Sequence, residues 1–174
     1  MLKLLATLRL QPILLACLLL SFTTASVAEE DWRELDWLEL MPEEDLRLLN
    51  NLPEIEHEGS GAATLPDEIL TGRVVPEMDG TRARIPGFVV PLKTVGNQRI
   101  VEFFLVPYFG ACIHVPPPPP NQIIHVTYEP GFTLDALYEP IWVQGTLKTE
   151  SVENDIGAAS YTLVSEKIEP YEGG

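Results

Sequence analysis

Short apolar runs rich in β-branched and aromatic residues, separated by turn residues, dominate the chain from about residue 72 onward. Such runs predict strands, because these side chains pack well on a pleated surface. The sequence TVGNQ at residues 94–98 predicts a hairpin turn between the first two strands. Residues 131–138 are compatible with a single helical turn. The predicted strands are residues 82–92, 99–106, 123–128, 141–148 and 161–168.

Five strands, with a turn or helix between the third and the fourth, match the order of a small Greek-key barrel of the oligonucleotide/oligosaccharide-binding (OB) shape. Closure of such a barrel removes exposed strand edges. A plain five- or six-stranded meander fits the same pattern. The favoured prediction is a mainly β fold, in which an OB-like five-stranded barrel spans residues 72–171 and a short tail follows at 172–174.

Residues 29–71 form a different, acidic segment before the barrel. Residues 29–58 hold twelve Asp or Glu against two Arg, and Trp and Leu recur there at helix-like intervals. We expect one or two short amphipathic helices, broken at Pro42, and then a linker rich in Gly, Ser and Ala. The acidic run is interpreted as a solvated face or a loose arm. A cation-concentrating arm or a docking segment is the alternative.

Residues 1–28 resemble a secretory signal peptide, with a basic start, an apolar run and small residues before the expected cleavage after Ala28. The apolar run is shorter than the ~20 residues that a membrane span needs. A lipoprotein signal ending at Cys17 is the weaker alternative, because apolar residues follow that cysteine. We therefore expect a bacterial periplasmic protein.

Net charge narrows the class of partner. The whole chain carries a formal charge of -15, and removal of residues 1–28 takes away Lys3 and Arg9, so nine basic residues remain against 26 acidic ones and the charge becomes -17. Phosphates of nucleic acids and anionic bilayers would meet a surface of their own sign. Nucleic acid is thus excluded as an expected partner. The cleavage also leaves Cys112 as the only cysteine of the mature chain.

The stretch FGACIHVPPPPPNQIIHV, residues 109–126, carries the most distinctive chemistry. Cys112 and His114 are two positions apart, so on an extended backbone their side chains point to the same side. Five consecutive prolines separate them from His125. Such a run favours the stiff polyproline II conformation and partly fixes the spacing between its two ends.

A thiolate and two imidazoles are recognised ligands of zinc and copper, and three protein ligands leave one coordination position open. We predict a metal site formed by Cys112, His114 and His125. Zinc ranks above copper because no methionine lies close to the motif. The candidates for a fourth ligand are Glu102, Glu129, Asp135 and, more remotely, His57.

A structural interpretation of the same residues stays open. Cysteine is often buried, and a half-buried histidine on a strand is commonly a core residue with its hydrogen bonds satisfied. His125 shares its predicted strand face with Ile123 and Thr127, which suits such a role.

The central motif, together with RIPGFVVPL upstream and PIWVQGTL and ASYTLVSEKIEPY downstream, resembles a secreted bacterial family of unknown function, DUF3299. The resemblance covers roughly residues 70–171, with a weaker echo at WLELMP in residues 37–42. It implies a small OB-like barrel, an envelope location and an association with transporters of the ATP-binding-cassette (ABC) type and with zinc handling. It implies no established activity.

Three functions are compatible with these observations. The first is a non-catalytic accessory protein that binds a transition metal and assists an ABC-type transport system. The second is an OB-like module that binds a ligand or protein without metal, with a platform of Phe103, Phe104, Tyr108, Phe109 and Trp142. The third is a thiol-dependent enzyme with Cys112 as nucleophile. It is the least favoured, because no other catalytic motif is present.

Overall fold

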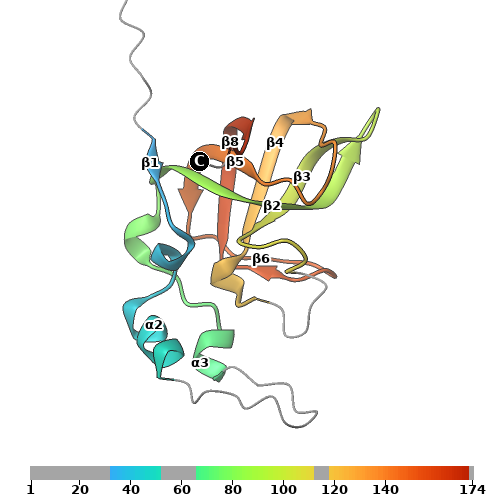
Figure 1. Ribbon diagram of the computed structural model, residues 1–174. Coiled ribbons are helices and arrows are strands. Elements are labelled where there is room, and N and C mark those ends of the chain that lie inside the picture. Colours follow the sequence, from blue (N-terminus) through green and yellow to red (C-terminus); the bar gives the residue numbers. More distant parts are fainter. Residues whose placement is uncertain (1–31, 52–65, 112–117, 173–174) are drawn as a thin grey trace, which may run out of the picture. The chain divides into compact units, whose positions relative to one another are not determined.

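The computed structural model describes residues 32–51, 66–111 and 118–172, and the predicted signal peptide lies outside these ranges (Figure 1). Within these ranges, no helix is long and apolar enough to cross a bilayer. Five long strands dominate the described residues. They are β2 (Arg82–Val95), β3 (Arg99–Val106), β4 (Ile124–Phe132), β5 (Ile141–Lys148) and β8 (Tyr161–Pro170).

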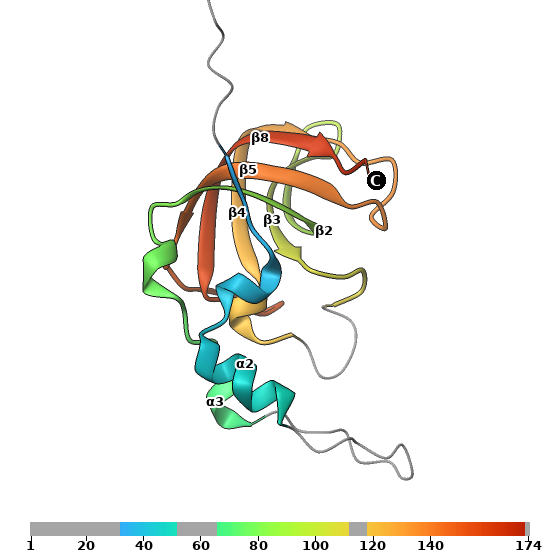
Figure 2. The ribbon, with the colours of Figure 1, turned by 60° about the vertical axis from the view of Figure 1, so that its left-hand side comes forward.

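These five strands form a closed barrel. Their order is β2-β3-β4-β8-β5, and β5 pairs back to β2. All the pairings are antiparallel except the one between β4 and β8. The last strand of the chain thus lies between the third and the fourth, as Figure 2 shows for β4, β8 and β5. This is the strand order of the OB fold, so the predicted barrel is confirmed and the meander is excluded.

Two local predictions have different outcomes. The hairpin turn after β2 is confirmed, with the amide of Arg99 donating to the carbonyl of Gly96 at 3.3 Å and positive φ at Asn97 and Gln98. The helical turn at residues 131–138 is wrong. β4 runs on through Phe132, and only bends and turns follow. One physical reason is that Phe132 packs edge-on against Phe103, 5.4 Å between ring centroids, which extends the strand along the core.

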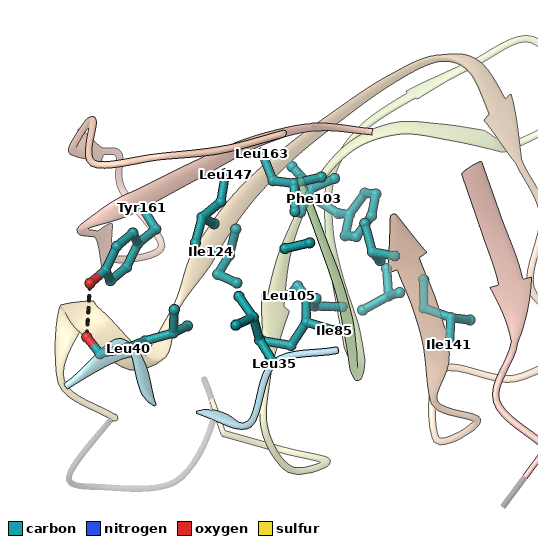
Figure 3. Packing of buried hydrophobic residues seen from close by; sticks show 14 of the residues in the cluster. Leu35, Leu40, Ile85, Phe103, Leu105, Ile124, Ile141, Leu147, Tyr161 and Leu163 are labelled. Carbon is teal, nitrogen blue, oxygen red and sulfur yellow. Dashed lines mark hydrogen bonds between the residues drawn. The ribbon is translucent and has the colours of Figure 1, made fainter. Parts of the chain in front are cut away.

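Alternating side chains of the five strands fill the barrel (Figure 3). Phe103 and Leu105 from β3 meet Ile124 and Val126 from β4, and all four are fully buried. Close packing of the strands leaves no space for a Cβ at Gly145, where a methyl group would collide with the carbonyl oxygen of Val164. Closure of the barrel therefore depends on a glycine at this crossing.

A second apolar cluster covers the outer face of β2 and β3. Phe104 and Val106 point away from the barrel interior and are fully buried beneath Ala111, Ile123 and Ala159. Ala159 belongs to a small hairpin that the sequence analysis did not predict, formed by β6 (Val152–Glu153) and β7 (Ala158–Ala159). The part of the barrel wall formed by β2 and β3 is thus covered by apolar side chains on both its inner and its outer face.

The acidic segment before the barrel is packed against it, contrary to the interpretation as a loose arm. Leu35 and Leu40 belong to the main core, and β1 pairs in parallel with β2. The predicted break at Pro42 is confirmed, because one helix ends before it and another begins after it. The elements that precede β2 are β1 (Arg33–Glu34), η2 (Trp37–Leu40), α2 (Glu43–Asn50), α3 (Asp67–Leu70) and η3 (Pro76–Met78).

The short helix η4 (Pro120–Gln122), at which the proline run ends, contacts the chain that precedes β2. The side chain of Gln122 donates to the carbonyl of Trp37 at 2.9 Å, and that of Asn121 donates to the carbonyl of Arg73 at 2.8 Å. A Cβ at Gly72, whose φ is +64°, would lie 2.5 Å from Pro120 Cβ. The start of β4 is thereby fixed in position.

Candidate functional site

His125 lies on the outer face of β4. Its neighbours Ile124 and Val126 point into the barrel, so strand alternation turns the imidazole outward. The side chain is only 12% exposed, because Phe104 packs edge-on against the ring at 6.0 Å between centroids. His125 is therefore nearly buried, as the structural interpretation expects, and it packs against the outer cluster and not in the barrel interior.

Glu102 of β3 contacts this histidine directly, with 2.9 Å between Oε1 of the carboxylate and Nε2 of the imidazole. Register explains the contact. Glu102 pairs with Thr127 and Phe104 pairs with His125, so Glu102 and His125 are diagonal neighbours on one face. An ionised carboxylate only accepts hydrogen bonds, so with Glu102 in that form Nε2 is the donor and the lone pair of a neutral ring lies on Nδ1. Nδ1 is thus the nitrogen that can bind a metal ion.

Cys112 and His114, the other predicted ligands, lie outside the described residues, as do Pro116 and Pro117. The residues on either side of this stretch, Ala111 and Pro118, are both buried. Ala111 belongs to the same cluster as Phe104, whose ring contacts His125. Consecutive Cα atoms are about 3.8 Å apart, so the chain enters the predicted motif from a fixed point in this cluster.

The candidate carboxylates for the fourth ligand do not lie together in the structure. Only Glu102 contacts His125. Glu129 lines a surface hollow that Glu102 also lines, whereas Asp135 lines a different hollow near the end of β8. His57 lies outside the described residues. Within residues 32–51, 66–111 and 118–172, no three His, Cys, Asp or Glu side chains are grouped closely enough to hold a metal ion.

The proline run is described only at its end. Pro119 has φ −58° and ψ 152°, which is polyproline II geometry, and Pro120 then begins η4. This part of the predicted spacer is therefore extended up to the first residue of a short helix.

The predicted aromatic platform is not a single surface. Phe103 is buried inside the barrel and Phe104 in the outer cluster. Tyr108 and Phe109 are exposed, and Phe109 contacts the exposed Tyr138, which the sequence analysis did not select. Trp142 lies elsewhere, with the guanidinium of Arg84 3.9 Å above its ring centre. Apart from Tyr108 and Phe109, these aromatics serve packing.

The contact between Glu102 and His125 could not be predicted from the sequence, because it depends on which strands pair and in which register. The sequence presents Glu102 only as one of several carboxylates near the motif. Glu102 stands in an otherwise apolar strand, RIVEFFLV, and this was the one signal in the sequence. In OB folds generally, ligands bind on the face of the second and third strands, which are β3 and β4 here.

Comparison with known proteins places the chain in a family. Residues 37–170 match the family described as "Protein of unknown function (DUF3299)". The chain is also similar to a crystal structure of a DUF3299 family protein from Pseudomonas aeruginosa PAO1. The two share 35% sequence identity with a TM-score of 0.63, over 83% of this chain and 99% of the other. No curated protein matches. From the strand order, the central motif and these matches, the chain belongs to the DUF3299 family.

Proposed function

We propose that this protein is a non-catalytic periplasmic protein that binds a transition metal ion, zinc in preference to copper, and assists an ABC-type transport system. Of the three proposed ligands, His125 lies within the described residues, and Cys112 and His114 are proposed from the sequence alone. The observation that carries the proposal is the contact of His125 with Glu102 at 2.9 Å. Histidines that bind metals commonly donate their second ring N–H to a carboxylate, which fixes the ring and makes it a better ligand.

The surroundings of His125 favour the same function. Phe104 excludes water from one side of the ring, and such an apolar wall strengthens the bond between a metal ion and its ligand. Ala111, next to Cys112 in the chain, is buried in the cluster that contains Phe104. An imidazole nitrogen and a thiolate are ligands that suit zinc, which takes His and Cys in tetrahedral geometry. Three protein ligands would leave a position for water or for a donor atom of the transport partner.

Zinc titration of the reduced protein, residues 29–174, against a chromogenic chelator tests the proposal. We expect about one zinc ion per chain, as for a site with three protein ligands. His125→Ala and Cys112→Ser should each weaken binding strongly, whereas Glu150→Gln, at a carboxylate that pairs with Lys148 and is not a candidate ligand, serves as the control. Far-ultraviolet circular dichroism checks that each variant is folded. Unchanged zinc affinity in both His125→Ala and Cys112→Ser would refute the metal site.

The transport role needs a test in cells. A strain that lacks the gene should grow more slowly than its parent when a chelator limits zinc in the medium. The wild-type gene should restore growth and the His125→Ala gene should not. Equal growth of the deletion strain and the parent under chelation, with zinc binding intact in vitro, would leave a zinc-binding protein with no part in uptake.

A further inference from the structure

The barrel splits between β4 and β8. These strands pair in parallel only between residues 124–127 and residues 161–164. Beyond this point β8 continues to Pro170 alongside β5 (Figure 2). Among the residues that the structure describes, no strand pairs with the β4-facing edge of β8 after Val164. An unpaired edge presents backbone N–H and C=O groups that a further strand can use.

A four-residue bulge of β4, residues 128–131, forms the other side of the split. Along β3 the pairing passes from Glu102 to Ile100, whereas along β4 it passes from Thr127 to Phe132, so four residues of β4 lie opposite one of β3. The guanidinium of Arg99 donates to the carbonyl of Pro130 within this bulge. The bulge is therefore held in place by a specific contact, and such bulges are common beside binding sites.

Two hollows follow one another along the split. The first has a volume of about 660 Å³ and is lined by Thr127 and Glu129 on one side and by Val164 and Ser165 on the other. The second, of about 190 Å³, lies further along both strands, where residues 132–135 face residues 168–170. Since β4 and β8 run in the same direction, the hollows occur in the same order on each strand.

The walls of the hollows combine apolar and acidic side chains. Val95 and Val164 are 42% and 59% exposed there. Lys93 is the one basic side chain in the described linings of the two hollows, which hold five carboxylates: Glu102, Glu129, Asp135, Glu139 and Glu169. A hydrogen bond from Lys167 lowers the pKa of Glu169, so that carboxylate is ionised at neutral pH.

We propose that this split binds an extended segment of a partner protein in which Lys or Arg alternates with apolar residues. The segment adds as a strand along the free edge of β8, its apolar side chains cover the exposed valines, and its cations face the carboxylates. Recognition by strand addition takes affinity from main-chain hydrogen bonds and specificity from alternate side chains. The proposal goes beyond metal binding and does not depend on it.

Fluorescence anisotropy with a synthetic probe tests the proposal. The probe is a fluorescein-labelled, capped decapeptide of alternating Lys and Val, added to the folded protein of residues 29–174 without metal. Two control peptides separate the contributions. Replacing every Lys by Glu reverses the charge, and replacing every Val by Pro keeps the charge but removes the amides that a strand donates. We expect binding of the Lys–Val peptide alone.

Two variants locate the probe in the split. Glu129→Lys and Val164→Arg place a positive charge in the first hollow, and each should weaken binding roughly threefold to tenfold, as expected for partly screened surface charges. Glu77→Lys, at an exposed position in η3 outside both hollows, makes the same charge change as Glu129→Lys and should have little effect. Equal weakening by all three variants, or equal binding of the Lys–Pro peptide, would overturn the proposal.

Discussion

The hydroxyl of Tyr161, in the last strand, donates a hydrogen bond to the carbonyl of Leu40 at 2.9 Å, across 121 positions of the chain (Figure 3). The same hydroxyl accepts a hydrogen bond from the amide of Val75 at 2.7 Å. Tyr161 and Leu40 are both fully buried, so the carbonyl of Leu40 cannot turn to water instead. One side chain therefore joins the acidic segment, the connection before β2 and the closing strand of the barrel.

Removal of this hydroxyl should destabilise the protein. Tyr161→Phe keeps the ring in the core but leaves the buried C=O of Leu40 and the partly buried N–H of Val75 without their partner, which costs about 1–3 kcal/mol. Urea denaturation followed by tryptophan fluorescence measures the loss. Tyr171→Phe is the matched control, because Tyr171 is partly exposed and its ring contact with Trp142 is kept. A Tyr161→Phe protein as stable as the wild type would contradict the assigned bonds.

Stability should also fall at alkaline pH through Tyr161. Burial raises the pKa of its hydroxyl above the ordinary value of 10, against an opposing effect of the hydrogen bond from Val75. The folded state therefore holds the proton more tightly than the unfolded state. Stability is fully present below pH 10 and declines as the pH rises above it. Urea midpoints across this pH range should fall more steeply for the wild type than for Tyr161→Phe, and parallel curves would count against this origin.

A methyl group at Gly145 should weaken the barrel. The added Cβ would collide with the carbonyl of Val164 and the side chain of Leu163, and neither strand can move without disturbing the closure. We expect Gly145→Ala to lower the free energy of unfolding by about 1–3 kcal/mol. Gly96→Ala is the control, because nothing lies within 4 Å of a Cβ there. Comparable urea midpoints for the two variants would show that the contact between β5 and β8 at Gly145 tolerates a side chain.

The contact of Glu102 with His125 predicts an effect on metal affinity without loss of a predicted ligand. Glu102→Gln keeps the size of the side chain but removes the charge that favours an Nε2–H tautomer. Loss of such a carboxylate partner typically weakens metal binding about 10–100-fold. Chelator competition compares this variant with Glu150→Gln, a carboxylate that pairs with Lys148 far along the chain. Identical affinities for the two would separate Glu102 from the metal site.

Local pattern in the sequence predicts the strands because each is a short run rich in β-branched and aromatic residues, bounded by turn residues. It did not predict the bulge of β4, because residues 128–131 look like an ordinary strand end until their pairing with β3 is known. The acidic segment has a composition dominated by charge, which by itself favours a loose arm. Two leucines, Leu35 and Leu40, nevertheless anchor it in the core.

The candidate site shows the same division. Sequence spacing alone placed His125 and Thr127 on one strand face, and the structure confirms that they share the outer face of β4. The contact of His125 with Glu102 could not be predicted, because a diagonal contact between two strands depends on their register. Cys112 and His114 lie outside the described residues, so their part in the metal site stays a prediction.

The order in which the chain is made has a consequence for how this barrel assembles. β8, the final strand, lies between β4 and β5. A chain truncated before Tyr161 would expose two open sheet edges at once, on strands made earlier, and such edges invite aggregation. The barrel can therefore close only after β8 has been synthesised, and until then the open edges of β4 and β5 can pair with other copies of the chain.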